Sequence, residues 1–265
     1  MATSVYLASS EGLSGKSAVA LGILDQLSRR VERVGVFRPI VRSQSAESAE
    51  SDHVLDLLLS RLDTGLTAAE ASAVGYEDVH IDPEGAMATI VDRFHAVAER
   101  YDAMLVIGSD YTDVTSPTEF SYNARIAANL DAPMVLVISS KGRTPEQVRV
   151  AAEIASEEAR THHARVLAVV SNRAVPEAVP ATQAALAEAL GDTAAYVIPS
   201  APVLESPTVR DLLTAVDGTH LYGDDDLLDR EALGLVVAAM TLPNVLDRLF
   251  EGCVVIAPPD RGDVL

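Results

Sequence analysis

The chain has 265 residues, of which 48% are hydrophobic and 22% are charged, a composition typical of a folded globular protein. Its 39 acidic and 20 basic residues give a net charge of −19, which disfavours nucleic acid and anionic membranes as partners. The sequence contains no apolar run of about 18 residues and no cleavable leader pattern, so we expect a cytoplasmic protein. The length suits one large domain or two unequal ones.

Short β-branched runs alternate with helical patterns through the first 200 residues, as in βαβ units around a mostly parallel sheet. Residues 43–52 lack apolar anchors and are predicted to form a mobile loop. We expect strands at 4–8, 34–38, 103–107, 134–139, 166–171 and 195–198. We expect helices at 15–30, 53–62, after Pro83, and at 119–129, 145–161 and 182–190. The predicted fold is therefore α/β, with a doubly wound sheet of six or more strands and helices on both faces.

Three prolines at positions 199, 202 and 207 predict a domain boundary, because proline fixes φ and removes a backbone donor. We expect residues 1–200 to form the α/β domain and residues 207–265 to form a small α+β domain. In the latter, helices are predicted at 208–216, 230–240 and 244–250 and a strand at 253–257, which holds the single cysteine, Cys253, in a structural role. Because this strand would need a partner, we expect the chain to be part of a longer protein.

Residues 10–17 follow the first strand and open the first helix, which is the setting of a loop that binds phosphate. The candidate anion-binding residues of this loop are Glu11, Gly12, Leu13, Ser14, Gly15, Lys16 and Ser17. Lys16 would reach the β- and γ-phosphates of a nucleotide, and the Ser17 hydroxyl would bind magnesium. Ser10 stands where the usual pattern has its first glycine. The alternative is a strand-to-helix turn without a ligand.

Two further segments lie at the same predicted edge of the sheet. Asp110 follows the strand 103–107 and is a candidate magnesium ligand, or alternatively a residue that caps a turn. Asn172 and Arg173 follow the strand 166–171 and are candidates for contact with a purine base or an anion, or alternatively form an ordinary turn. The histidines at 80, 162 and 163 lack a recognisable metal spacing and are interpreted as solvated or capping residues.

The loop ending Gly15-Lys16-Ser17, together with segments 36–40 and 101–106, resembles dethiobiotin synthetase and its relatives. In that family a Lys-Pro pair follows the second strand, where this chain has Arg38-Pro39. The family also has an acidic residue at the end of the central strand, where this chain has Ile107. The resemblance therefore implies the fold of that family, while Ile107 counts against its ATP-dependent carboxylation.

Segments 144–148, 171–173, 239–246 and 255–263 resemble the N-terminal half of long bacterial phosphate acetyltransferases, which ends in a DRTGG-type domain. The resemblance implies acetyl transfer between acetyl-CoA and phosphate by a C-terminal catalytic domain of the same polypeptide, with no catalytic residue in this chain. It also implies a role in regulation or in assembly of a homo-oligomer. The candidate ligands of the loop are a nucleotide, phosphate or sulfate, together with magnesium. A free-standing ligase of the dethiobiotin synthetase type and an interaction module without ligand remain as alternatives.

Overall fold

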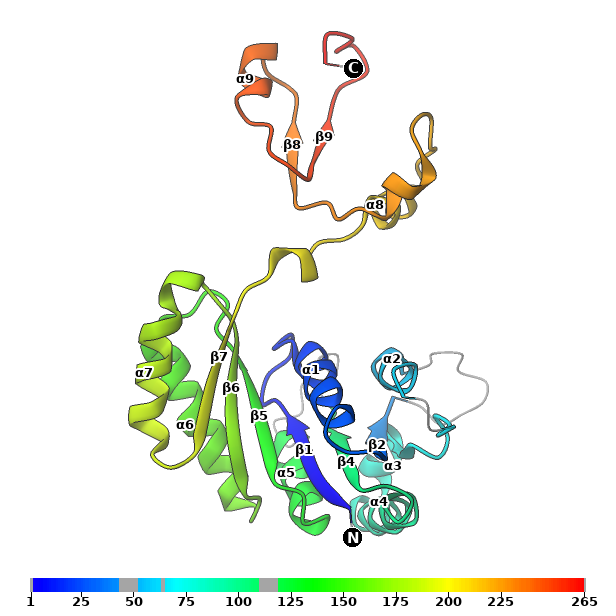
Figure 1. The fold of residues 1–265 in the computed structure, drawn as a ribbon, viewed down its shortest axis with the longest axis vertical. Helices are drawn as coiled ribbons and strands as arrows, with labels where there is room; N and C mark the ends of the chain where they lie inside the picture. Colours follow the sequence, from blue (N-terminus) through cyan, green and yellow to red (C-terminus); the bar gives the residue numbers. More distant parts are fainter. Residues whose placement is uncertain (1, 43–51, 63–64, 110–118, 265) are drawn as a thin grey trace. The chain divides into compact units, whose positions relative to one another are not determined.

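The computed structural model describes residues 2–42, 52–62, 65–109 and 119–264 (Figure 1). The chain divides into two compact units, Met1–Ser200 and Ala201–Leu265. The predicted mobile loop lies outside the described residues, except for its last residue, Asp52. None of the helices within the described ranges is long and apolar enough to cross a membrane.

A seven-stranded sheet forms the centre of the first unit, and all its strand pairs are parallel. Its strand order is β3-β2-β4-β1-β5-β6-β7. The strands are β1 (Thr3–Ala8), β2 (Val34–Val41), β3 (Ser72–Gly75), β4 (Ala103–Ile107), β5 (Met134–Ser139), β6 (Val166–Ala174) and β7 (Ala194–Pro199). This is a doubly wound α/β fold, as the alternating sequence pattern predicts.

Helices cover both faces of this sheet, with α1 on one face and α5 and α6 on the other (Figure 1). The distribution follows from right-handed crossovers, because the chain winds from β1 to β3 in one direction and from β4 to β7 in the other. The helices are α1 (Lys16–Ser28), α2 (His53–Leu59), α3 (Tyr76–Ile81), α4 (Pro83–Ala98), α5 (Glu119–Asn129), α6 (Pro145–Thr161) and α7 (Val179–Leu190).

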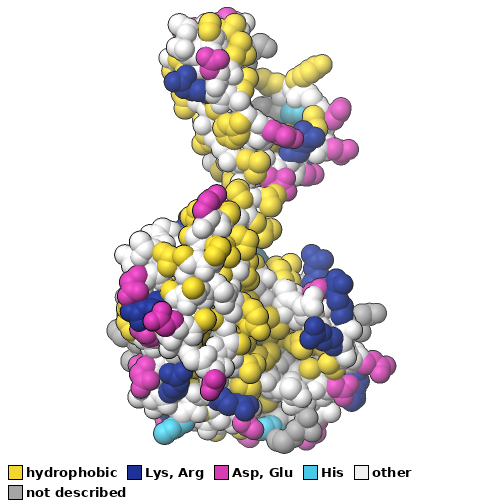
Figure 2. Space-filling model, turned by 60° about the vertical axis from the view of Figure 1, so that its left-hand side comes forward, with side chains coloured by type: hydrophobic (Ala, Val, Ile, Leu, Met, Phe, Trp, Pro, Cys, Tyr) yellow, Lys and Arg dark blue, Asp and Glu magenta, His cyan; other side chains and the backbone are white. Residues whose placement is uncertain are grey.

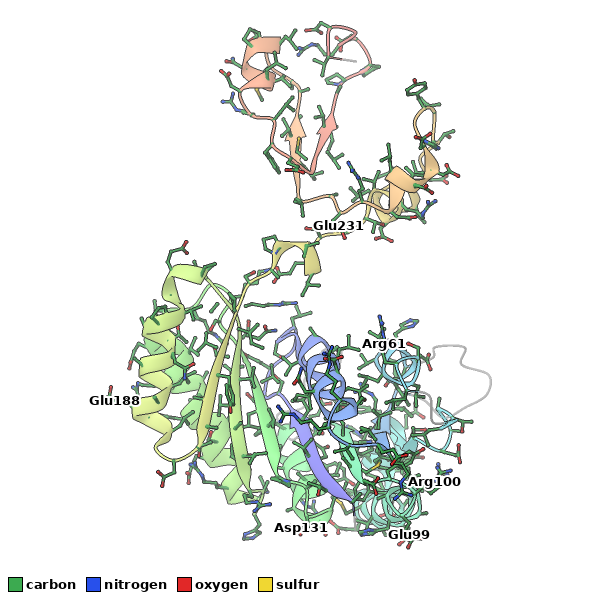
Figure 3. All side chains as sticks on the ribbon, viewed as in Figure 1. Arg61, Glu99, Arg100, Asp131, Glu188 and Glu231 are labelled. Carbon is green, nitrogen blue, oxygen red and sulfur yellow. The ribbon has the colours of Figure 1, made fainter. Side chains whose placement is uncertain are left out.

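The core lies on both sides of the central strands, where every residue of β4 is buried and β1 ends in three buried residues. Continuous apolar runs of this kind are expected for strands covered on both faces. Outward-pointing charged residues such as Glu99, Arg100, Asp131 and Glu188 surround this core (Figure 3). Hydrophobic side chains also reach the surface of both units (Figure 2), among them Tyr196 and Ile198 of the edge strand β7.

The strand β2 is three residues longer than predicted, because Pro39 does not end it. Its pairing with β4 stops at Phe37, and beyond that point it pairs only with β3, through Arg38, Ile40 and Val41. Proline is tolerated where its missing N–H is not required by a neighbouring strand. The partner strand β3 and the helix α3, which follows it directly, were not predicted.

The second unit contains a helix α8 (Val209–Ala215), a short helix α9 (Leu242–Leu246) and two parallel strands, β8 (Gly234–Val237) and β9 (Cys253–Ile256). The predicted helix 230–240 is wrong, because β8 occupies its centre. Exposure alternates along this strand: Leu235 and Val237 are 60% and 53% exposed, whereas Val236 is 7% exposed. That period of two, with the β-branched pair Val236 and Val237, favours a strand over a helix.

Candidate functional site

The loop 10–17 follows β1, at the centre of the sheet, and includes the first two residues of α1. Leu13 and Gly15 both adopt left-handed backbone conformations, with φ of 57° and 78°. Gly15 is the N-cap of α1, and no side chain caps the helix at this position. The first-turn N–H groups of α1 therefore lack a capping side chain at the loop, as in helix ends that receive an anion.

Asn172 and Arg173 hold the loop from β6, which is close to where the sequence predicts them. The Asn172 side-chain amide donates to the Ser14 carbonyl at 3.0 Å, and the Arg173 guanidinium donates to the Leu13 carbonyl at 2.8 Å. Both residues belong to β6 itself, near an irregularity in its pairing with β7, and Arg173 has a φ of 63°. In this structure they fix the backbone of the loop.

Glu11 ties the loop to the segment between β5 and α6. Its carboxylate forms two hydrogen bonds with the Arg143 guanidinium, at 2.8 and 2.5 Å, and accepts a third from the Ser139 N–H at 2.6 Å. A bidentate arginine–carboxylate pair has a fixed planar geometry, so it sets position as well as energy. Glu11 is thus engaged in holding the loop. The sequence gives no local signal for Arg143, which is 132 residues away.

Two buried cationic side chains converge on one backbone carbonyl at the end of β4. The Lys16 ammonium, on a side chain that is 2% exposed, donates to the Gly108 carbonyl, and the Arg38 guanidinium donates to the same oxygen at 3.4 Å. Arg38 also forms an ion pair with Asp52, the N-cap of α2. The arginine that replaces the family's lysine therefore lies beside Lys16. Both side chains lie where the loop meets the carboxyl edge of the sheet, and the charge of Arg38 is paired with Asp52.

Asn123 of α5 fixes the chain on the other side of Gly108. Its side-chain oxygen accepts from the buried Tyr6 hydroxyl at 2.7 Å and from the Ser109 N–H at 3.1 Å. Its amide nitrogen donates to the Ser109 hydroxyl at 3.1 Å. Burial raises the pKa of Tyr6, although Arg38 acts in the opposite direction, so the phenol remains a neutral donor. The turn that carries Gly108 is consequently held by these two hydrogen bonds between Asn123 and Ser109, and Tyr6 fixes the Asn123 side chain.

The predicted magnesium ligands are only partly placed. Ser17 lies in the first turn of α1 and is half-buried, whereas Asp110 lies outside the described residues. Within the described ranges there is no cluster of three or more residues of metal-binding type. Ile107, at the position of the ligase family's acid, is fully buried in the core. A carboxylate in its place would be buried as well.

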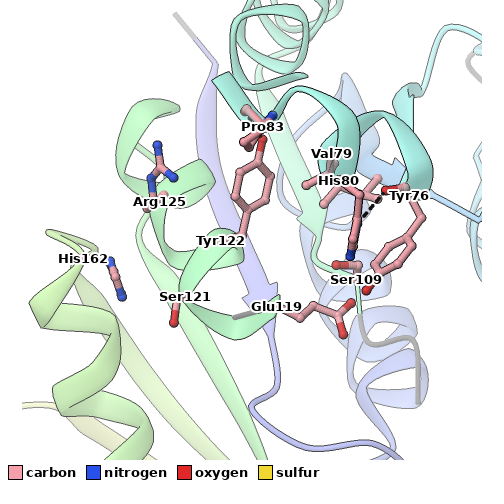
Figure 4. Close-up of a pocket in the computed structure, with 11 residues that line it drawn as sticks. Tyr76, Val79, His80, Pro83, Ser109, Glu119, Ser121, Tyr122, Arg125 and His162 are labelled. Carbon is pink, nitrogen blue, oxygen red and sulfur yellow. Dashed lines mark hydrogen bonds between the residues drawn. The ribbon is translucent and has the colours of Figure 1, made fainter. Parts of the chain in front are cut away.

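A separate cavity of about 380 Å³ lies between α3 and α5 at the carboxyl edge of the sheet (Figure 4). The rings of Tyr76 and Tyr122 and two of the predicted solvated histidines, His80 and His162, line it. His163, in contrast, is exposed at the end of α6. Sequence analysis missed this cavity because its walls come from segments up to 122 residues apart that share no motif.

Comparison with known proteins identifies the family of the chain. A family model described as an AAA domain matches residues 3–208, which is more than half of the chain. The chain belongs to this AAA domain family. A second model, described as a DRTGG domain, matches residues 211–265, as the tail segments indicate.

Curated relatives of this AAA domain chain include two proteins named phosphate acetyltransferase. The protein from Synechocystis sp. is 31% identical over 273 residues, and the protein from Nitratidesulfovibrio vulgaris is 29% identical over 278 residues. Each match covers 100% of this chain but only 39% of the relative. Among solved structures, the septum site-determining protein MinD from Pyrococcus horikoshii, complexed with Mg-ADP, matches with 16% identity and a TM-score of 0.48. That match covers 77% of this chain and 84% of MinD.

Proposed function

We propose that this chain is the non-catalytic N-terminal region of a phosphate acetyltransferase, which converts acetyl-CoA and phosphate into acetyl phosphate and CoA. The observation that carries the proposal is the similarity of the whole chain to about two fifths of proteins with that name. The chain spans 39% of those relatives, so the catalytic domain is assigned to the remaining part of the polypeptide. Regulation and assembly of the enzyme are then the roles of this region.

The loop 10–17 is the proposed regulatory site for an anion, such as phosphate or the phosphate groups of a nucleotide. Two features support this assignment: the uncapped helix end that follows Gly15, and the two cations at Gly108. Lys16 has three N–H donors, so it can approach an anion and keep or exchange its bond to Gly108. Ser17 would then ligate a magnesium ion bound with a nucleotide.

The same geometry gives no support to a free-standing ligase. Ile107 is buried at the position where the dethiobiotin synthetase family has its acidic residue, and burial of an isolated carboxylate there would be unfavourable. The relatives described above are named phosphate acetyltransferases, which does not favour the ligase alternative. An anion at the loop therefore acts as an effector in our proposal, with no reaction at this site.

The loop assignment is tested by titrating the purified chain with phosphate and with ATP and magnesium in a calorimeter. Lys16→Ala should weaken anion binding by about tenfold or more, because a charge-assisted hydrogen bond contributes about 1.5–3 kcal/mol. Lys141→Ala, which removes an exposed lysine between β5 and α6, is the matched control and should bind like the unmodified chain. Equal affinity in both variants, or no binding by the unmodified chain, would reject the loop as an effector site.

A further inference from the structure

The cavity beside α5 has features of a second ligand site. Its volume of about 380 Å³ lies in the range of small-molecule pockets. Its residues come from β2, from α3 and the start of α4, from the residue Ser109 after β4, from α5, and from the end of α6. None of the described residues that line it belongs to the loop 10–17, although one of them, Ser109, directly follows the Gly108 that Lys16 contacts.

Most of the cavity wall is apolar or aromatic. Ile40, Val79 and Pro83 line it together with the rings of Tyr76 and Tyr122. The Tyr122 hydroxyl donates to the Pro83 carbonyl at 2.7 Å, which fixes its ring across the middle of the site (Figure 4). A ligand with a flat or compact apolar body fits such a wall, because it can contact the fixed ring faces.

Opposite charges lie at the two ends of this wall. In the view of Figure 4, Arg125 lies on one side of Tyr122, and Glu119 and Ser109 lie on the other. Glu119 and Arg125 both belong to α5 and are six residues apart, which corresponds to about 9 Å along a helix axis. The cavity is therefore polarised along the helix, with a cation at one end and an anion at the other.

The Arg125 guanidinium can bind the carboxylate of a ligand in addition to that of Glu84. One of its terminal nitrogens donates to Glu84 at 2.6 Å, and the Glu84 side chain is 75% exposed. An exposed ion pair of this kind contributes at most about 1 kcal/mol, and a guanidinium carries five N–H donors. The guanidinium also lies 5.6 Å from the centre of the Tyr122 ring, which holds it at the cavity wall.

Glu119 disfavours a ligand that carries a second negative charge at the end of the cavity opposite Arg125. Its carboxylate also raises the pKa of Tyr76, after the larger effect of burial, so that ring remains uncharged. Glu119 already has another interaction partner, but a carboxylate offers about four acceptor positions, so a hydroxyl or an amine of a ligand at this end can still donate a hydrogen bond to it. The highly charged phosphates of a nucleotide are disfavoured at the Glu119 end of the cavity.

We propose that the cavity binds a small monocarboxylic acid, with its carboxylate on Arg125, its apolar body on Tyr122, and a hydroxyl or amino group directed at Glu119. The proposal does not depend on anion binding at the loop. It assigns a second small-molecule site to the chain, with a ligand class that differs from that of the loop.

Ligand-observed NMR titration of the intact chain tests this proposal with three probes of similar shape. The probe 4-hydroxyphenylacetate carries the acid and the hydroxyl at opposite ends of a ring, and should bind saturably. Its neutral amide lacks the charge for Arg125 and should bind at least about tenfold more weakly. The dianion 4-carboxyphenylacetate places a second carboxylate near Glu119 and should not compete.

Matched arginine variants locate the site. Arg125→Gln should weaken binding of 4-hydroxyphenylacetate by about tenfold or more, while leaving that of its amide unchanged. Arg100→Gln removes an arginine from an exposed pair with Glu70 outside the cavity (Figure 3), and should change neither affinity. Glu119→Gln should allow the dianion to bind. The proposal is overturned if the acid does not bind saturably at millimolar concentration, if the acid and its amide bind equally, or if the two arginine variants behave alike.

Discussion

A methyl group added to Gly15 would lie 2.2 Å from the side-chain nitrogen of Asn172, which is much closer than a normal contact. Glycine at this position thus meets two requirements. It leaves room for the Asn172 side chain, and it adopts a φ of 78°, which glycine tolerates without strain. The sequence motif predicts glycine for the turn, but only the structure shows that β6 lies against it. The close fit explains how Asn172 reaches the Ser14 carbonyl.

Gly15→Ala should therefore destabilise the first unit more than Gly142→Ala. Gly142 has a similar φ of 70°, but an added methyl group there meets nothing within 4 Å. Both variants carry the cost of a left-handed alanine, about 1–2 kcal/mol, and only Gly15→Ala adds about 1–3 kcal/mol for overpacking. Urea unfolding measures the difference, and removal of the Asn172 side chain in a double variant should reduce it. Equal losses of stability would contradict the close contact.

Some residues of the candidate site could be predicted from the sequence, and others could not. The loop and the pair Asn172-Arg173 could be placed at one edge, because carboxyl ends of parallel strands meet there. The contact of Glu11 with Arg143 could not be predicted, since neither residue belongs to a motif with the other. Arg38 was noticed through family resemblance alone, and its shared contact with Lys16 at Gly108 required the fold.

At the scale of elements, long periodic segments were predicted well and short ones poorly. The bounds of β4, α5 and α6 agree with the sequence prediction, because each has a strong apolar pattern and, for α6, a capping box at Thr144. The strand β3 has only four residues and is followed directly by α3, so no connecting turn separates the two elements. In β8, an apolar run was mistaken for a helix face.

The two strands of the second unit offer a test of that corrected assignment. Val236→Ala should destabilise the unit by about 1.5 kcal/mol, because it removes two buried methyl groups. Val237→Ala changes the neighbouring residue, which is 53% exposed, and should cost less than about 0.5 kcal/mol in this chain. Hydrogen exchange of the amides in β8 and β9 measures both effects locally. Similar costs at the two positions, as on a buried helix, would contradict the strand.

For the whole molecule, a net charge of −19 coexists with two buried cationic side chains that meet at the Gly108 carbonyl. The overall field disfavours anionic polymers, whereas the two buried cations favour a small anion at one point. An effector regulates by binding more tightly to one global state of the enzyme than to another, and about 1–3 kcal/mol of coupling suffices. A region without its own chemistry can therefore control a catalytic domain in the same polypeptide.

The central claim is tested most directly by comparing the full-length enzyme with a version that lacks residues 1–265. Acetyl phosphate formation from acetyl-CoA would be measured against added phosphate and nucleotides, together with the mass of each assembly. We predict that the shortened enzyme keeps acetyl transfer and loses its response to effectors or its native assembly, while the isolated chain forms no acetyl phosphate. Unchanged kinetics, effector response and mass after the deletion, or acetyl transfer by the isolated chain, would contradict the account.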